Sequence, residues 1–172
     1  MISKVLANRL KRCLDKCVSQ EQSAFVEGRS ILDNALIAIK VIHALKRKTQ
    51  GRRGELALKI DINKAYDKVD WGFLRGFLSR MGFCGQWIDW MMMCVSSVNY
   101  AVIMQLIMCV TPGCGLRQGD PLSPYLFILV AEGLTSLIHQ AVGRDDIHGV
   151  RVCRGSPEVL MTYRHTLISM LI

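Results

Sequence analysis

The stretch LKIDINKAYDKVDW, residues 58 to 71, constrains the fold most strongly because its hydrophobic period changes partway along. Up to residue 62, apolar and polar residues alternate, which predicts a strand with one buried face formed by Leu56, Leu58, Ile60 and Ile62. From Lys64 the apolar residues recur every three or four positions, which predicts a helix that ends at Gly82. Asp61 therefore lies on the polar side of a strand, where the strand gives way to a helix.

Two interpretations of Asp61 follow from this position. A carboxylate at a strand-to-helix junction is a common place to hold a metal ion. Asp and Asn also favour the position before the first turn of a helix, so Asp61 or Asn63 could instead cap the predicted helix. This stretch does not separate the two by itself.

Charge is distributed unevenly along the 172 residues, whose formal net charge is +8. Residues 1 to 60 hold 13 of the 22 Lys and Arg but 5 of the 14 Asp and Glu, and residues 61 to 172 hold 9 of each. Clustered cations gain free energy by releasing counterions from phosphates, so the pattern favours nucleic acid over a membrane as partner. The alternative is a solvated basic surface. With 51% hydrophobic residues, the chain can form one domain or part of a larger one.

The seven cysteines are odd in number and scattered through apolar segments, and no secretory leader precedes them. They predict reduced thiols in an intracellular protein, with nucleus and cytoplasm both open. Cys13 and Cys17 could share a helix face, but no second pair at zinc-ligand spacing accompanies them. The apolar runs are shorter than the roughly 20 residues that span a bilayer, so no membrane segment is predicted. The basic N-terminal segment could be a transit peptide, but a surface helix is the simpler interpretation.

The remaining pattern predicts further elements of a single unit. Helices are expected at residues 2–17, with Val5, Leu6, Leu10 and Leu14 on the apolar face, and at 31–48, 86–95 and from Pro121 or Ser123 to Val142. Residues 99–110 are expected to form strand material, and a hairpin is one arrangement of it. GRRG at 51–54 is expected to be a loop.

A polar loop with two glycines, GLRQGDPLSP at 115–124, precedes the last predicted helix. Gly115 and Gly119 permit close approach of a backbone to a ligand, Arg117 supplies a positive charge, and Gln118 offers a donor and an acceptor. The N-terminal end of a helix attracts anions, so this loop suits a nucleotide or a phosphate backbone. A simple turn would give the same pattern.

The order of three motifs, QSAFVEGRSILDN, LKIDINKAYDKVDW and GLRQGDPLSPYLF, resembles the reverse transcriptase domain of non-LTR (LINE-type) retrotransposons, particularly those of plants. The resemblance covers residues 2 to about 157. It implies an α/β (α+β) fold, a right-hand polymerase palm with mostly helical fingers, incomplete and without a thumb. The implied division is a fingers-like region at 1–54, a palm-like region at 55–157, and an aberrant tail at 158–172.

The resemblance also implies roles for particular residues. Asp61 matches the aspartate that holds the catalytic Mg²⁺ ions, and Tyr66 matches the aromatic residue under the sugar of the incoming nucleotide. Gln118 and Gly119 would line the nascent base pair with Arg117 nearby, and Arg29 would face template or triphosphate. The partners expected from the family are an RNA template, a DNA primer and a dNTP. In this chemistry two Mg²⁺ ions activate the attacking oxygen and neutralise the leaving pyrophosphate, which requires several carboxylates.

The sequence departs from this family where a hairpin with paired aspartates is expected. After GVRVCRGSPEV at 149–159 it reads LMTYRHTLISMLI, and no Asp follows Asp146. The pair Asp145-Asp146 has the wrong flanks and is expected to be a solvated turn. Leu-Met-Thr and Met-Leu-Ile can arise from codons for Ala-Asp-Asp read in another frame, which makes a frame slip a hypothesis.

Three functions are compatible with these features. The first is a fragment of an RNA-directed DNA polymerase that lacks activity as it stands. The second is a nucleic-acid-binding remnant without catalysis. The third is the product of a decayed element with no selected role. The sequence leaves the oligomeric state open.

Overall fold

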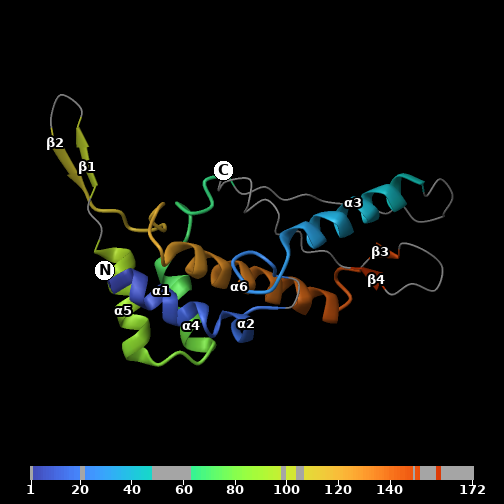
Figure 1. The fold of residues 1–172 in the computed structure, drawn as a ribbon, viewed down its shortest axis with the longest axis horizontal. Helices are drawn as coiled ribbons and strands as arrows, with labels where there is room; N and C mark the ends of the chain where they lie inside the picture. The colour runs from blue at the N-terminus through green and yellow to red at the C-terminus, as the bar shows by residue number, and fades with distance from the viewer. Residues whose placement is uncertain are drawn as a thin grey trace. The chain divides into compact units, whose positions relative to one another are not determined.

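The computed structural model describes residues 2–19, 22–47, 63–97, 100–103, 107–148, 150–151 and 158–159 (Figure 1). The chain divides into two compact units that are both discontinuous in sequence. The first unit comprises Met1–Ser19 and Lys64–Gly133, and the second comprises Gln20–Asn63 and Leu134–Ile172. The division predicted at residue 54 and the tail beyond residue 159 lie outside the described residues and stay predictions.

The first unit is built mainly from helices. It contains α1 (Ile2–Lys11), α2 (Leu14–Cys17), α4 (Trp71–Arg80), α5 (Gly85–Ser96) and the N-terminal part of α6 (Ser123–Gly143). α5 packs against both α1 and α4. Apolar side chains fill the core of this unit, and the most deeply buried are Leu10, Leu14, Leu74, Leu78, Met91, Leu122, Leu126 and Leu129. Because these residues recur at helical spacing, burial of one stripe per helix accounts for the packing.

The predicted helix at 2–17 is broken in the structure. Arg12 and Cys13 donate backbone N–H groups to Arg9 and Leu10, three residues back, so the chain tightens into a turn between α1 and α2. Leu10 and Leu14, one on each side of this turn, are both buried. Val5 is 50% exposed and lies beside Leu6 in the lining of an apolar groove, so it shares the predicted apolar face without being buried.

α4 begins at Trp71 and not at Lys64, which corrects the predicted helix start. Lys64 adopts a positive φ of 53°, and Asp70 is the N-cap, whose side chain accepts a hydrogen bond from the Phe73 N–H at 2.6 Å. Neither Asp61 nor Asn63 therefore caps this helix, and that interpretation was wrong. The end predicted for this helix, at Gly82, is confirmed.

The end of α4 has the form of a Schellman motif. The Gly82 N–H donates to the Ser79 carbonyl, the Phe83 N–H donates to the Leu78 carbonyl, and Gly82 has a φ of +85°. The positive φ explains why a glycine occupies this position.

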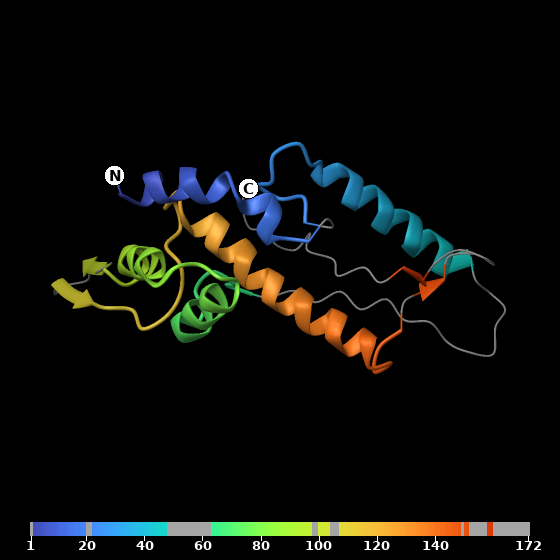
Figure 2. The same cartoon turned by 90° about the horizontal axis from the view of Figure 1, so that it is seen from below.

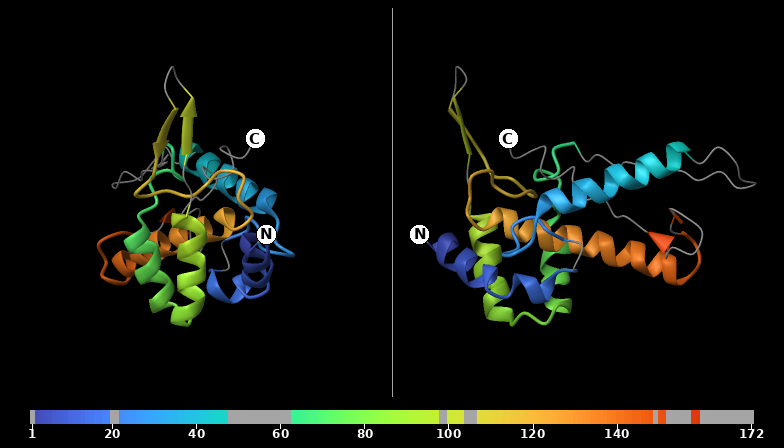
Figure 3. Two further views of the ribbon diagram at one scale, coloured as in Figure 1. Left: turned by 90° about the vertical axis from the view of Figure 1, so that its left-hand side faces the viewer. Right: turned by 45° about the vertical axis from the view of Figure 1, so that its right-hand side comes forward.

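β1 (Tyr100–Ile103) and β2 (Ile107–Val110) form the predicted antiparallel hairpin, with Tyr100 opposite Val110 and Ile103 opposite Ile107. The hairpin projects away from α5 (Figure 3). The helix predicted from Pro121 or Ser123 is confirmed as α6, which runs as one continuous helix (Figure 2). By length and composition α6 could cross a membrane, but buried residues such as Leu126, Ile128 and Leu129 fit a core helix equally well.

The second unit contains the predicted helix at 31–48, which is α3 (Ile31–Arg47), together with β3 (Val150–Arg151) and β4 (Glu158–Val159). β3 and β4 pair antiparallel, with Val150 opposite Val159. The described residues are thus mainly helical with two short hairpins. The strand predicted at 56–62, which would place Asp61 in a palm sheet, lies outside them.

Candidate functional site

Four hydrogen bonds fasten residues 66–71 to residues 114–116, and we call this set of contacts the clasp. The Leu116 N–H donates to the Tyr66 carbonyl at 2.8 Å, and the Gly115 N–H donates to the Val69 carbonyl at 2.8 Å. The Trp71 indole Nε1 donates to the Gly115 carbonyl at 2.7 Å, and the Cys114 thiol contacts the Asp67 carbonyl at 3.4 Å. The clasp joins the second and third motifs of the sequence directly.

The clasp also explains why the predicted helix starts late. Residues 64–69 form successive turns, in which the N–H groups of Asp67, Lys68 and Val69 donate to carbonyls three residues back. The carbonyls of Tyr66 and Val69 accept hydrogen bonds from Leu116 and Gly115, contacts that link residues distant in sequence. Tertiary hydrogen bonds thus compete with helix continuation in this segment, and the periodic apolar residues do not reveal it.

Tyr66 lies in the core of the first unit. It is 9% exposed, its ring stacks on Phe127 with centroids 4.7 Å apart and an interplanar angle of 16°, and burial raises the pKa of its phenol. The ring therefore makes an aromatic contact with α6. The role expected at the sugar of a nucleotide stays a prediction.

Gly115 occupies a position that only glycine fits well. Its φ is +93°, and a Cβ there would lie 3.1 Å from both the Cα and the carbonyl oxygen of Asp67. Those atoms belong to the backbone of Asp67, so moving them away would cost more free energy than turning a flexible side chain. The close approach predicted for a glycine here is therefore an approach to the protein's own backbone.

The three residues after the clasp, Arg117, Gln118 and Gly119, are exposed. Gly119 has a φ of +83° with nothing within 4 Å of a Cβ, so it needs its left-handed conformation and leaves open space. On the far side, the Asp120 carboxylate accepts a hydrogen bond from the Leu122 N–H at 2.8 Å. The loop that was expected to bind nucleotide is thus held at both ends and open to solvent between them.

Arg29 belongs to the second unit. Its guanidinium Nη1 donates to the carbonyl of Gln22 at 2.7 Å across the loop of the first motif, and the turn contains Gly28 at φ +78°. Gln22 is 1% exposed, its side-chain oxygen accepts from the Ala24 N–H at 3.2 Å, and its Nε2 has no hydrogen-bond partner in the described part of the chain. Arg29 therefore stabilises its own loop, whatever else it contacts.

Asp61, Arg52 and Arg53 lie outside the described residues, so their predicted roles are not placed. Among the residues that the structure describes, no group of three or more His, Cys, Asp or Glu side chains gathers as a metal site would require. The described residues alone do not form a magnesium site. The turn predicted for Asp145-Asp146 is confirmed, since both are exposed just beyond α6.

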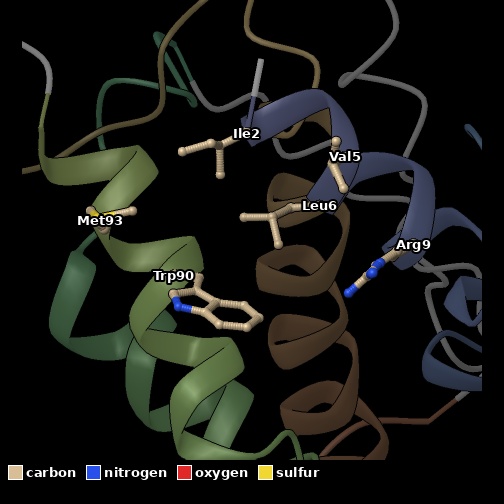
Figure 4. A pocket seen from close by; sticks show the side chains of 6 residues that line it. All are labelled: Ile2, Val5, Leu6, Arg9, Trp90 and Met93. Atoms are coloured by element: carbon tan, nitrogen blue, oxygen red, sulfur yellow. The ribbon is translucent and has the colours of Figure 1, made fainter.

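An apolar groove of about 350 Å³ lies between α1 and α5, and none of its lining residues belongs to the clasp (Figure 4). Its lining residues are Ile2, Val5, Leu6, Arg9, Trp90 and Met93. It supplies one charged group, Arg9, and no carboxylate. Its chemistry suits apolar contacts and not metal-dependent catalysis.

Trp71 and Asp70 are positioning groups that were not among the residues predicted from the sequence. The signal for Asp70 was present, since Asp followed by the apolar helix residues of 71–80 is a typical N-cap pattern. No comparable signal exists for Trp71, because its partner is 44 residues away and is a backbone carbonyl.

Residues 1–154 match the family described as reverse transcriptase (RNA-dependent DNA polymerase). The chain is 30% identical over 147 residues to a 149 kDa protein of transposon TX1 from Xenopus laevis, covering 81% of the chain and 11% of that protein. It is 25% identical over 142 residues to a retrovirus-related Pol polyprotein from the type-1 retrotransposable element R2 of Nasonia vitripennis, covering 81% of the chain and 13% of that protein.

A mitochondrial protein of Arabidopsis thaliana is 54% identical over 50 residues, which is 29% of the chain and 41% of that protein. The chain spans about a tenth of the length of the two long relatives. The family match covers both the clasp and the loop of Arg117, Gln118 and Gly119. The chain belongs to the reverse transcriptase (RNA-dependent DNA polymerase) family.

Proposed function

We propose that this chain forms the fingers and most of the palm of a LINE-type reverse transcriptase of the plant type. The observation that carries the proposal is the clasp, which brings the motif containing Tyr66 against the loop containing Arg117, Gln118 and Gly119. The two motifs are far apart in sequence, so a simple turn cannot account for their contact. The contact places residues of both motifs at one site.

In this proposal the finer architecture is an α/β palm with mostly helical fingers, and Asp61 lies on the polar side of a strand at its junction with the following segment. Reverse transcriptases use divalent metal ions and act on nucleic acid templates. Asp61 would supply one hard oxygen ligand to Mg²⁺, and further carboxylates are required to share the ion. Arg117 and Gln118 are exposed and would contact the nucleotide, and Arg29 would contact template or triphosphate while it holds the Gln22 carbonyl.

The substrates proposed are an RNA template, a DNA primer and a dNTP. The basic first third of the sequence supports a phosphate partner, because 13 of the 22 Lys and Arg precede residue 61. Binding of an RNA–DNA hybrid should weaken steeply with salt, since each neutralised phosphate adds roughly 0.7 to 0.9 to the slope of log affinity against log salt.

The test compares two triple variants in salt-titrated binding of an RNA–DNA hybrid. One replaces Arg29, Arg52 and Arg53 by Gln, and the matched control replaces Arg75, Arg80 and Arg144, which removes the same charge elsewhere. We expect the first variant to lose most of the affinity and to show a slope smaller by about 2 to 3. A flat salt response of the native chain, or equal loss in both variants, would refute nucleic-acid binding through the fingers.

A second candidate function is a nucleic-acid-binding remnant without catalysis. It is favoured by the basic first third of the sequence, because clustered Lys and Arg bind phosphates without any metal site. Primer extension with Mg²⁺ tests this chain for catalysis. We expect the 172-residue chain to bind the hybrid and to synthesise no DNA, whereas extension that is lost in Asp61→Ala would establish an active polymerase and refute the non-catalytic remnant.

A further inference from the structure

We infer that Trp71 is a positioning residue that aims the loop of Arg117, Gln118 and Gly119 at the incoming nucleotide. The inference rests on the proposed function and concerns the same site. No motif of the sequence points to Trp71 in this role. Its basis is the hydrogen bond of 2.7 Å from the indole Nε1 to the Gly115 carbonyl.

Both backbone groups of Gly115 are held by the segment that leads into α4. Its N–H donates to the Val69 carbonyl and its carbonyl accepts from Trp71, two residues further on. Gly115 is therefore held from two sides, and its φ and ψ cannot change much without the loss of one of the two hydrogen bonds. The next residue, Leu116, is 4% exposed and bonded to the Tyr66 carbonyl.

Trp71 is itself fixed, because it is the first residue of α4. The Asp70 side chain caps this helix at the Phe73 N–H, and Leu74 and Leu78 are fully buried at 0% exposure. The indole has one hydrogen-bond donor and no acceptor, so its contact with the Gly115 carbonyl sets one orientation of the ring. A rigid helix thus determines the direction in which the chain leaves the clasp.

The far end of the loop is fixed independently. The Asp120 carboxylate accepts from the Leu122 N–H, and the Asp120 carbonyl accepts from the Ser123 N–H at 3.2 Å, where α6 begins. Only three exposed residues lie between the two anchored ends. Groups held this way keep their geometry before a ligand arrives, and loss of such preorganisation weakens binding without any lost ligand contact.

The test uses Trp71→Phe, which keeps an aromatic ring and removes the donor, with Trp90→Phe on α5 as the matched control. The first measurement needs no ligand and follows hydrogen exchange of the peptide that contains the Gly115 and Leu116 amides. We expect exchange at least tenfold faster in Trp71→Phe and unchanged exchange in Trp90→Phe. Unchanged exchange in Trp71→Phe would overturn the inference.

The second measurement is the affinity for an RNA template–DNA primer duplex with and without the complementary dNTP. Trp71→Phe should retain the duplex affinity within twofold and lose at least tenfold of the dNTP-dependent gain. An equal loss of both affinities would show a merely structural role, and an unchanged dNTP-dependent gain would overturn the inference while leaving the proposed function intact. A native chain that shows no dNTP-dependent gain would refute the nucleotide site itself, and the inference with it.

Discussion

Gly115 and Asp67 approach so closely that a Cβ on the glycine would lie 3.1 Å from the carbonyl oxygen of Asp67. The carbonyl of the same glycine accepts a hydrogen bond from the Trp71 indole, and its N–H donates to the Val69 carbonyl. The close contact between the two motifs therefore depends on a glycine at this position.

Replacing Gly115 by Ala should be the most destabilising of three glycine substitutions in this segment. The left-handed backbone costs about 1–2 kcal/mol, and overpacking against the backbone of Asp67 adds about 1–3 kcal/mol to the loss in free energy of unfolding. Gly119→Ala meets no atom within 4 Å and should cost only the backbone strain, about 1–2 kcal/mol.

Gly113→Ala meets no atom within 4 Å and should change the free energy of unfolding by less than about 0.5 kcal/mol. Urea unfolding of the three variants gives the order. Equal effects at Gly115 and Gly119 would contradict the close contact with Asp67.

Asp70→Ala should lower the free energy of unfolding by about 1 kcal/mol, because the Phe73 N–H loses its acceptor at the start of α4. Asp70→Asn should recover most of the loss, since an amide oxygen can accept the same bond. Asn63→Ala should have little effect. If the Asn63 variant were the less stable one in thermal or urea unfolding, the helix would begin near Lys64 as the periodicity alone predicts.

Asp145→Gly should stabilise the chain. Asp145 has a φ of +60° at the end of α6, where its N–H donates to the Val142 carbonyl and the next N–H, of Asp146, donates to the Ala141 carbonyl. This is a Schellman motif with an aspartate at the position that favours glycine, so we expect a gain of about 0.5–1 kcal/mol. Asp146→Gly removes the same charge without relieving a left-handed backbone and serves as the control. A gain in both variants would assign the effect to charge.

Cys17 should resist alkylation at mildly alkaline pH. Burial chiefly, with the neighbouring Cys13 and Asp15, raises the pKa of its thiol from 9.0 to about 11. Because the folded pKa exceeds the unfolded value, the protonated thiol contributes stability that is complete below pH 9 and is lost as the pH rises through about 11.

Iodoacetamide labelling at pH 9, read out by mass spectrometry, should modify exposed Cys84 and Cys114 well before Cys17. Between pH 9 and 11, the free energy of unfolding should fall less in Cys17→Ser than in the native chain. Labelling of Cys17 as fast as Cys84 would contradict the raised pKa.

Most helices and the first hairpin could be predicted from the sequence, because each buries an apolar stripe or alternates over a short run. α5, with Ile88, Met91 and Met92 buried, is typical of that success. The start of α4 could not be predicted from periodicity, since Tyr66 and Val69 are buried at helical spacing without being helical. Their carbonyls bond to residues 115 and 116, and such tertiary partners leave no local pattern.

The candidate site, like the fold, could be predicted from the sequence only in part. The loop of Arg117, Gln118 and Gly119 was evident from its glycines and its place before a helix, whereas the indole that fixes it was not. The order of motifs identified the family. It did not indicate that Arg29 would hold the carbonyl of Gln22 inside its own loop.

The first compact unit joins Met1–Ser19 to Lys64–Gly133, with residues 20–63 between them in sequence. During synthesis, α1 leaves the ribosome well before its packing partner α5 exists, so Leu6 and Leu10 stay open to solvent and to chaperones for that interval. Bringing the two parts together requires closing a long loop before any contact between them is gained, which slows folding. A chain in which a short linker replaces residues 20–63 should therefore fold this unit faster than the native chain does.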